Sequence, residues 1–466
     1  MKFRKFGKTV LTAALSSAIV FSLSSCVRSF TSGYLYVTGT VTATPSGNGI
    51  ITGFKIDNNN GKLTALHGFP LASGGANPVR IVLLNGGNFV YVLNEGVNSA
   101  GNTSCTSADP CTNSNITEFS VGGNGILTFQ NSYTTEGFNP IRLIPDSSGS
   151  YLVALDHDAP GTTNPAAPSS ATNPNSYCLQ QLGATTCGDA TVFSVNTTTG
   201  RLSKIVNAQL SSQAGTQITY FPLPANPIDF TFASGTLLTL TGAASASPTA
   251  TASNPAFPAQ AVYSYNYSNG QLAVNSGLTP LTNGAGNPVG QATAITYAGS
   301  KIYVLDNEPI PQNAATAPGQ VLTFTCCNSQ GGIQTITGGA VADDPTQTDP
   351  IYLIVDAKTK YVFVVNEEGF GINNGPGITK YTIDPTSSQL TETTAFPNPI
   401  GTGAVPQCIL EDPSSQFIYT ANAGDSTVTG QKLDPNSGAL SVVTGWSGQV
   451  LLNGPATWCV ATGRTN

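Results

Sequence analysis

Acidic side chains recur in this sequence at the points where short apolar runs end. Glu95 follows one such run, Glu367 follows another, and His157 stands between two aspartates. Only 9% of the 466 residues are charged, so this recurrence sets these points apart from the rest of the chain. Carboxylates that converge on one place can bind Ca²⁺ or Mg²⁺, hold a sugar, or act as general acid and base; Asp and Asn also favour turns without any function, which is the alternative. The groups are Asn94-Glu95, Asp156-His157-Asp158, Asp306-Asn307-Glu308, Asn366-Glu367-Glu368 and residues 422–425.

These groups supply candidates for catalysis and for substrate binding. Glu95 and Glu367 are candidate catalytic carboxylates that would activate water, and Asp306 is a candidate for the same task or for holding the substrate. His157 could act as a general base, because histidine titrates near neutral pH. It precedes a proline-rich segment, so a surface loop residue without a catalytic role is the alternative.

Two arginines occupy the same position of a repeated motif. Arg80 and Arg142 both stand two residues after a proline, and Asp229 holds that position in the next copy. Alternation along a strand directs these side chains to the same side, which we expect to be a central channel. Arginine binds carboxylate and phosphate through two parallel hydrogen bonds, so Arg80 and Arg142 are candidate substrate ligands. The alternative is a structural Arg–Asp bridge between neighbouring units, because a buried arginine is nearly always paired.

One sequence unit recurs along most of the chain and determines the predicted fold. Each unit has a proline followed by an alternating apolar stretch, a turn, a second apolar stretch of the Tyr-Val kind, and a third stretch that leads into a hairpin. Asn-Gly and other glycine-containing turns supply the positive φ that tight hairpins need. Four strands per unit, repeated in this way, are typical of β-propeller blades. The repeated prolines are Pro78, Pro140, Pro227, Pro288, Pro350, Pro406 and Pro455.

The two ends of the sequence contribute to one unit. The first copy begins at Tyr34 without a proline stretch, and residues 454–460 supply the missing stretch. A tail strand that pairs with the first copy would close a ring without an exposed edge. We therefore predict an all-β protein, with a seven-bladed β-propeller of four-stranded antiparallel blades over residues 34–462.

These motifs resemble those of a known family. The proline stretch, the run Tyr91 to Asn94 and the run Asp434 to Leu440 are similar to YVTN-type propellers, and more narrowly to the lactonase family related to 6-phosphogluconolactonase. The resemblance spans almost all of residues 34–461 and implies a propeller that hydrolyses a lactone. Members of that family commonly carry histidine beside the proline where an inner strand begins. The corresponding positions here are Asn77, Asn139, Asn226, Asn287, Asp349, Val405 and Gly454.

Long insertions fall after the second stretch of a unit, so in a propeller they share one face. Insertions gathered on one face of a rigid scaffold are typical of a binding side. They span residues 96–114, 157–189, 242–259, 309–318 and 369–376.

The N-terminal segment predicts export. Basic residues, an apolar run over residues 10–23 and the sequence Leu23-Ser24-Ser25-Cys26 resemble a bacterial lipobox. We expect a signal peptide over residues 1–25, lipidation of Cys26, a tether over residues 26–33 and attachment to the membrane through this lipid anchor. Val27 lacks the aspartate of an inner-membrane retention signal, which favours the outer membrane of the cell envelope. An ordinary secretory signal or an uncleaved anchor is the alternative.

An exported protein can form disulfides, and the chain has 9 cysteines including Cys26. Cys105 with Cys111, and Cys178 with Cys187, each bracket a polar loop, and we predict that each pair forms a disulfide. Cys408 and Cys459 stand on innermost strands of adjacent units and could be joined between blades. The pairing of Cys326 and Cys327 stays open.

Two functions remain open at this point. The first is an extracytoplasmic lactonase, in which Arg80 or Arg142 holds an acidic lactone and a carboxylate activates water, with or without a divalent cation such as Ca²⁺ or Mg²⁺. The second is a non-catalytic surface propeller that binds a glycan or a protein. A quinone-dependent dehydrogenase lacks support because Trp occurs only 2 times. With a formal charge of -7 and no basic stripe, we expect a monomer that does not bind nucleic acid.

Overall fold

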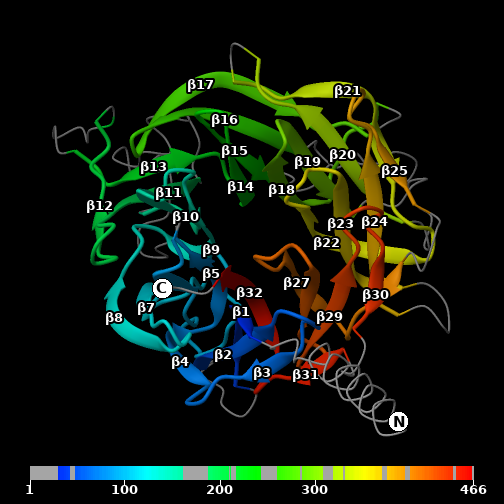
Figure 1. The fold of residues 1–466 in the computed structure, drawn as a ribbon. Helices are drawn as coiled ribbons and strands as arrows, with labels where there is room; N and C mark the ends of the chain where they lie inside the picture. Colours follow the sequence, from blue (N-terminus) through cyan, green and yellow to red (C-terminus); the bar gives the residue numbers. More distant parts are fainter. Residues whose placement is uncertain are drawn as a thin grey trace, which may run out of the picture.

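Seven antiparallel sheets of the computed structural model radiate around a common centre (Figure 1). This confirms the predicted all-β, seven-bladed propeller. Within the described residues no helix could cross a membrane. The structure describes residues 30–41, 48–84, 86–160, 187–208, 210, 217–242, 260–283, 286–307, 318–328, 331–369, 375–393, 399–443 and 448–463. The predicted signal peptide and Cys26 lie outside these ranges.

The first three blades are built from the beginning of the chain, with the last strand added to the first blade. Blade 1 contains β32 (Ala456–Gly463), β1 (Thr31–Thr40), β2 (Asn48–Asp57) and β3 (Leu63–Ala65), and β4 (Leu71–Ala76) also pairs with β2. Blade 2 contains β5 (Pro78–Leu83), β6 (Phe89–Asn94), β7 (Asn115–Val121) and β8 (Leu127–Tyr133). Blade 3 contains β9 (Phe138–Pro145), β10 (Tyr151–Asp158), β11 (Gly188–Val195) and β12 (Leu202–Lys204), and β13 (Tyr220–Leu223) pairs with β11.

The remaining four blades follow in chain order. Blade 4 contains β14 (Pro227–Ala233), β15 (Thr236–Thr241), β16 (Ala261–Ser268) and β17 (Gln271–Pro280). Blade 5 contains β18 (Ala292–Ala298), β19 (Lys301–Asp306), β20 (Gln320–Thr325) and β21 (Gln334–Ala342). Blade 6 contains β22 (Gln347–Val355), β23 (Tyr361–Gly369), β24 (Gly377–Ile383), β25 (Leu390–Glu392) and β26 (Ile400–Gly401). Blade 7 contains β27 (Pro406–Glu411), β28 (Phe417–Asn422), β29 (Thr427–Leu433), β30 (Leu440–Val442) and β31 (Gln449–Leu451).

The predicted ring closure is confirmed. The C-terminal strand β32 pairs antiparallel with β1, and Tyr36 lies opposite Val460. A disulfide between Cys408 of β27 and Cys459 of β32 joins blade 7 to blade 1. The ring is therefore closed by backbone hydrogen bonds and by a covalent link between the two blades that meet there.

Every innermost strand carries a register shift at an equivalent place, where it pairs with the last residues of the second strand. In blade 2 the shift lies between Pro78 and Arg80, and in blade 6 between Pro350 and Tyr352. An extra residue at this point breaks the simple alternation, so two successive side chains can approach the channel. The equivalent shifts in blades 1, 3, 4, 5 and 7 fall at Ala456–Trp458, Pro140–Arg142, Pro227–Asp229, Ala292–Ala294 and Pro406–Cys408.

The proline motif misplaces two of these strands. In blade 5 the residue that pairs like Pro78 is Ala292, opposite Asp306, whereas Pro288 lies in an upstream loop and forms a bridge with Thr282. In blade 1 it is Ala456 rather than Pro455. Proline fits the first position of a strand but is not needed there, so it is an imperfect marker of where an inner strand begins.

Tyrosines of the second strands fasten blades 1, 2, 6 and 7 to a hairpin of the next blade. The hydroxyl of Tyr36 donates a hydrogen bond to the carbonyl of Gly125 at 2.7 Å, and Tyr419 donates to Gly61 at 2.7 Å. Both glycines have positive φ, 80° at Gly125 and 65° at Gly61, a conformation that glycine adopts without steric cost. The repeated Tyr-Val stretch and the repeated glycine turn are thus two halves of one blade-to-blade contact.

Two further disulfides have both cysteines within the described residues. Cys105 is bonded to Cys111, as predicted, and Cys326 is bonded to Cys327. Cys187 is also disulfide-bonded, while Cys178, its predicted partner, lies outside the described residues.

Candidate functional site

A cavity of about 280 Å³ opens in the central channel, and the two arginines singled out from the sequence line it. The lining comes from the register shifts of four blades and from Arg142 of a fifth. The residues at the shift differ from blade to blade, so the same backbone feature presents different side chains to the channel. The lining residues are Val79, Arg80, Arg142, Ile351, Tyr352, Gln407, Thr457 and Trp458.

Arg80 is enclosed by aromatic rings. Its Cζ lies 3.2 Å from the ring centroid of Trp458 and 5.9 Å from that of Tyr352. The two rings meet edge to face, with centroids 4.7 Å apart. Aromatic faces attract a guanidinium but leave its N–H groups unbonded. No residue in the described part of the chain accepts a hydrogen bond from the Arg80 guanidinium, although Arg80 is only 6% exposed.

Arg142, in contrast, is paired. Its Nε donates to Asp229 Oδ1 at 2.8 Å, which is the structural bridge considered as the alternative. Asp229 also accepts from the backbone N–H groups of Phe230 and Ile295, each at 3.0 Å. Burial and the positive charge of Arg142 both lower the pKa of Arg80, with Asp229 acting in the opposite sense. An anion placed in the cavity would relieve this unfavourable burial of positive charge.

Glu95 lies at the end of β6, where blade 2 passes into the insertion that spans residues 96–114. The Nδ2 group of Asn77 donates a hydrogen bond to Glu95 Oε2 at 2.7 Å. Burial raises the pKa of Glu95 to about 7, while the neighbouring His157 and the Asn77 hydrogen bond act to lower it. A carboxyl group with a pKa near the working pH can both donate and accept a proton.

His157 is held by an ordered carboxylate. Its Nδ1 lies 3.0 Å from Asp158 Oδ2, and the side chain of His157 is 34% exposed. Asp158 also accepts hydrogen bonds from Asn139 at 2.6 Å and from Ser107 at 2.7 Å. Burial alone would raise the pKa of Asp158, but the hydrogen bonds from His157, Ser107 and Asn139 outweigh it and lower that pKa. An ionised Asp158 keeps a proton on Nδ1 and leaves Nε2 of His157 as an acceptor.

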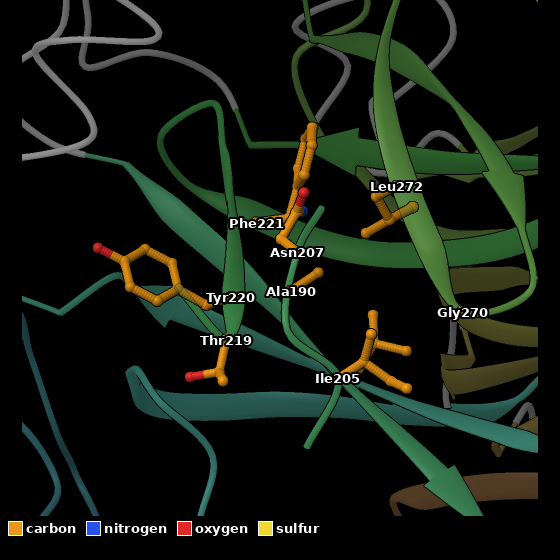
Figure 2. Close-up of a pocket in the computed structure, with 9 residues that line it drawn as sticks. Ala190, Ile205, Asn207, Thr219, Tyr220, Phe221, Gly270 and Leu272 are labelled. Carbon is orange, nitrogen blue, oxygen red and sulfur yellow. The ribbon is translucent and has the colours of Figure 1, made fainter. Parts of the chain in front are cut away.

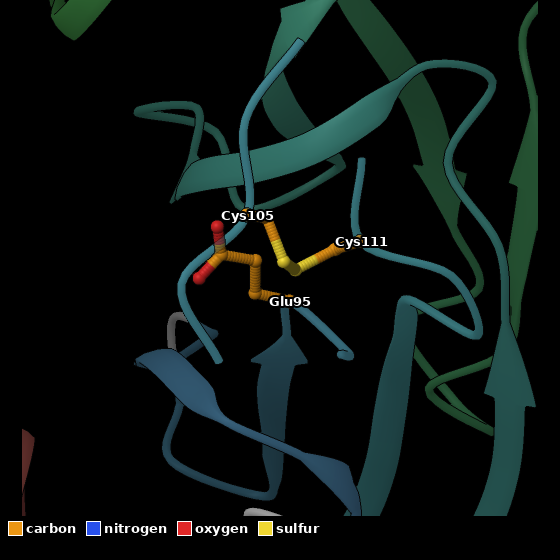
Figure 3. A group of neighbouring side chains, drawn as sticks. All are labelled: Glu95, Cys105 and Cys111. Atoms are coloured by element: carbon orange, nitrogen blue, oxygen red, sulfur yellow. A yellow bond between two sulfur atoms is a disulfide. The ribbon is translucent and has the colours of Figure 1, made fainter. Parts of the chain in front are cut away.

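The asparagines that directly precede Pro78 and Pro140 hold both carboxylates. Asn77 and Asn139 have φ values of 50° and 53°, a region in which Asn is several-fold enriched among non-glycine residues. Asn139 also accepts the backbone N–H of Cys111 at 2.7 Å, so it links the insertion of blade 2 to blade 3. The Cys105–Cys111 disulfide of that insertion lies beside Glu95 (Figure 3).

The comparisons with known proteins agree with this architecture. Residues 312–450 match the family model described as lactonase, 7-bladed beta-propeller. The model and this chain thus share the seven-bladed propeller fold. A candidate 6-phosphogluconolactonase from Bacteroides fragilis is similar at a TM-score of 0.58, with 16% identity over 92% of this chain and 98% of that chain. The periplasmic gluconolactonase of Pseudomonas aeruginosa is similar at a TM-score of 0.58, with 16% identity over 93% of this chain and 100% of that chain. No curated protein matches the sequence.

Of the predicted site residues, Arg80 and Arg142 line the cavity, whereas Glu95, His157, Asp306 and Glu367 are not among its lining residues. Asp306 is fully buried and accepts a hydrogen bond from Gln320 at 2.6 Å. Glu367 is at the end of β23 in blade 6, where burial, Asp349 and Glu368 raise its pKa. The acidic groups that follow apolar runs in the sequence therefore lie in different structural environments.

Metal binding has limited support among the described residues. Glu95, Cys105 and Cys111 form the one group of three metal-ligating side chains found there, with ligand atoms within 4.8 Å of one another. The two sulfurs are bonded to each other, and a disulfide does not offer the thiolates that bind metals. Binding of Ca²⁺ or Mg²⁺ stays a prediction.

Three cavities in the described part of the chain lie outside the channel, and none of the predicted site residues lines them. A crevice of about 10 Å³ lies between blades 3 and 4, where Ala190, Ile205 and Leu272 approach one another (Figure 2). It has room for about one water molecule. A larger apolar hollow of about 240 Å³ lies nearby, lined by residues such as Tyr263 and Leu278.

Tyr352, Trp458, Asn77 and Asn139 were missed as site residues by sequence reasoning. Tyr352 and Trp458 occupy the inner-strand position of Arg80, so an alignment of all seven strands would have found them. Trp458 was missed because Pro455 suggested that the inner strand of blade 1 begins one residue earlier than it does, which shifts the position equivalent to Arg80. Asn77 and Asn139 precede the repeated prolines and were noted there only as departures from histidine.

Proposed function

We propose that this protein is an extracytoplasmic lactonase whose substrate is a lactone bearing an acidic group. The observation that carries the proposal is Arg80, a buried cation in the channel whose N–H groups have no acceptor in the described part of the chain. Carboxylate and phosphate match the planar fork of a guanidinium. The aromatic rings of Tyr352 and Trp458 beside it suit the apolar face of a sugar-like ring.

Glu95 and His157 supply the acid–base chemistry of the proposed reaction. His157 Nε2 takes a proton from a water molecule as its oxygen bonds to the lactone carbonyl carbon. The protonated Glu95 then donates a proton to the ring oxygen as the bond between that oxygen and the carbonyl carbon breaks. The product is the open hydroxy acid, and a proton passes back from His157 to Glu95 through solvent. Arg80 and Glu95 come from the same end of blade 2, since Arg80 pairs with Leu93, two residues before Glu95.

The comparisons support the substrate class and the location. The similar structures include proteins described as a gluconolactonase and as 6-phosphogluconolactonase candidates, and the gluconolactonase is described as periplasmic. The lipobox-like sequence at Cys26 supports attachment to the outer membrane by lipid. We therefore place the proposed reaction in the cell envelope, acting on a small acidic lactone.

The test is turnover of a lactone panel by residues 27–466, with gluconolactone and 6-phosphogluconolactone as the neutral and charged members. We expect the charged lactone to be preferred, with or without EDTA. Arg80→Met should remove that preference by raising KM for the charged lactone about 10- to 100-fold, the loss expected for about 1.5–3 kcal/mol of charge-assisted hydrogen bonding. Arg201→Met, which removes an exposed arginine, is the matched control. Hydrolysis no faster than the uncatalysed background for every lactone would exclude the proposal.

A non-catalytic binding propeller is the second candidate. It is favoured by the absence of histidine at the positions that precede the inner strands, where Asn77 and Asn139 serve instead to hold carboxylates. In that case the Arg80 cavity would bind an acidic glycan without turnover. A glycan-array signal that Arg80→Met abolishes, together with no hydrolysis, would favour this second function.

A further inference from the structure

Two buried aspartates face each other beneath the His157–Asp158 pair. Asp156 of β10 and Asp189 of β11 are direct partners in the antiparallel register, and both are 0% exposed. Each has one oxygen with a donor: Gly137 N–H lies 3.2 Å from Asp156 Oδ2, and the Thr191 hydroxyl lies 3.3 Å from Asp189 Oδ2. The other two oxygens, Asp156 Oδ1 and Asp189 Oδ1, have no hydrogen-bond partner among the described residues.

The other blades show what this position normally contains. Asn94 of blade 2, Asn366 of blade 6 and Asn422 of blade 7 occupy the place of Asp156. The amide of each donates to the third strand of its blade: Asn94 to Asn115 at 2.8 Å, Asn366 to Thr379 at 3.1 Å, and Asn422 to Thr427 at 2.9 Å. In blade 5 the third strand supplies the donor instead, because Gln320 of β20 donates to Asp306 at 2.6 Å.

Blade 3 is the exception, since neither aspartate carries an N–H group. Two ionised carboxylates in this position would repel each other, because both side chains are buried and bulk solvent screens them little. A single proton on one carboxyl supplies the missing donor and removes one charge. We propose that Asp156 and Asp189 share one proton, and that this proton holds together the end of blade 3 that carries His157 and Asp158.

The surroundings favour this arrangement. Gly137 packs directly against the pair, and a Cβ built on it would overlap Asp189 Oδ1. Burial raises the pKa of Asp156 to about 7, and burial together with the charge of Asp156 raises that of Asp189. The charged groups that face the pair from neighbouring segments are Glu136 and Lys204, which are bonded to each other at 2.6 Å and so largely offset one another.

The pH dependence follows from the direction of these shifts. The folded state binds the shared proton more tightly than the unfolded state, so the stabilisation is present at low pH and is lost as pH rises through about 7. Above that pH the pair carries two charges and the β10–β11 contact weakens. The positioning effect on His157 rests on the proposed function, whereas the shared proton does not.

Asp156→Asn tests the proposal by restoring the amide that three other blades have. We expect the thermal midpoint of the wild type to fall as pH rises from about 4 to about 7, the range between the ordinary pKa of aspartic acid and the raised pKa of Asp156, and Asp156→Asn to reduce that fall. Glu368→Gln, which removes one exposed carboxylate, should leave the fall unchanged. Equal falls in the wild type and in Asp156→Asn would overturn the proposal.

Infrared spectroscopy provides a second readout. At pH 6 we expect the carbonyl stretch of a protonated carboxylic acid shielded from solvent, lost at pH 9. Because burial also raises the pKa of Glu95 to about 7, the band is compared in Glu95→Gln, where the contribution of the pair should remain, and in Asp189→Asn, where it should change. Absence of such a band, with a midpoint that EDTA lowers, would show a bound cation in place of the proton and refute the inference. If lactone hydrolysis fails but the band and the pH slope behave as expected, the shared proton stands and only the proposed function is lost.

Discussion

The Cys408–Cys459 disulfide makes ring closure measurable. It spans 51 residues of sequence and joins the two innermost strands that meet where the ends of the propeller come together. Loop-closure entropy in the unfolded chain predicts a stabilisation of about 4 kcal/mol at 25 °C for a loop of this length. Cys105–Cys111 spans only 6 residues, for which the same relation predicts about 2 kcal/mol.

The perturbation is the double variant Cys408→Ala/Cys459→Ala, compared with Cys105→Ala/Cys111→Ala. Alanine suits the first pair because both cysteines are buried and because Ala294 occupies the position of Cys408 in blade 5. Urea unfolding followed by tryptophan fluorescence should show the closure variant destabilised by about twice as much as the loop variant. Equal losses in the two variants, or no loss in the closure variant, would refute the argument that the disulfide acts by constraining the open chain.

Three further predictions follow from the contacts between and within blades. Tyr419→Phe removes the hydrogen bond to Gly61 and should cost about 1 kcal/mol in urea unfolding, whereas Tyr263→Phe, whose hydroxyl bonds to no residue in the described ranges, should cost less. Gly137→Ala should lower the thermal midpoint at every pH, because its Cβ would overlap Asp189, and an unchanged midpoint would contradict the packing described for the pair. Because burial raises the pKa of Glu95 to about 7, kcat/KM for lactone hydrolysis should fall as pH rises through that value; Glu95→Gln should be nearly inactive and lose this dependence, and an unaltered pH profile would exclude Glu95 as the acid.

The fold was predictable from the sequence because its signals are repeated. The tyrosine at Tyr91 and the glycine turn at Gly200 recur as a pair, and the structure shows that they bond to each other across the blade boundary. Repetition averages out local irregularities, so the number of blades and the closure by β32 both came out correctly. The start of β18 did not, since blade 5 has alanine where the motif expects proline.

The site was only partly predictable, because its residues are brought together by the fold from segments that are far apart in the sequence. Arg80 and Arg142 were recognised by their shared spacing from proline, but their different partners, Trp458 and Asp229, come from distant segments. Asp306 and Glu95 looked alike as acidic strand ends. Asp306 and Glu95 differ in how deeply they are buried and in which side chain bonds to each carboxylate, and neither property can be read from the local sequence.

The residues at equivalent inner-strand positions differ among the blades, and these differences indicate which part of the channel binds a ligand. At the inner-strand position after the register shift, blade 5 has Ala294 and blade 7 has a disulfide cysteine, whereas blades 1, 2 and 6 bring Trp458, Arg80 and Tyr352 together. A structural requirement common to all blades would have selected similar residues throughout. Charged or aromatic residues instead occupy this position in blades 1, 2, 3, 4 and 6. Arg142 and Asp229 pair with each other, whereas the buried charge of Arg80 is costly unless a ligand binds it. That unrelieved cost is the physical reason to expect an anionic ligand in this propeller.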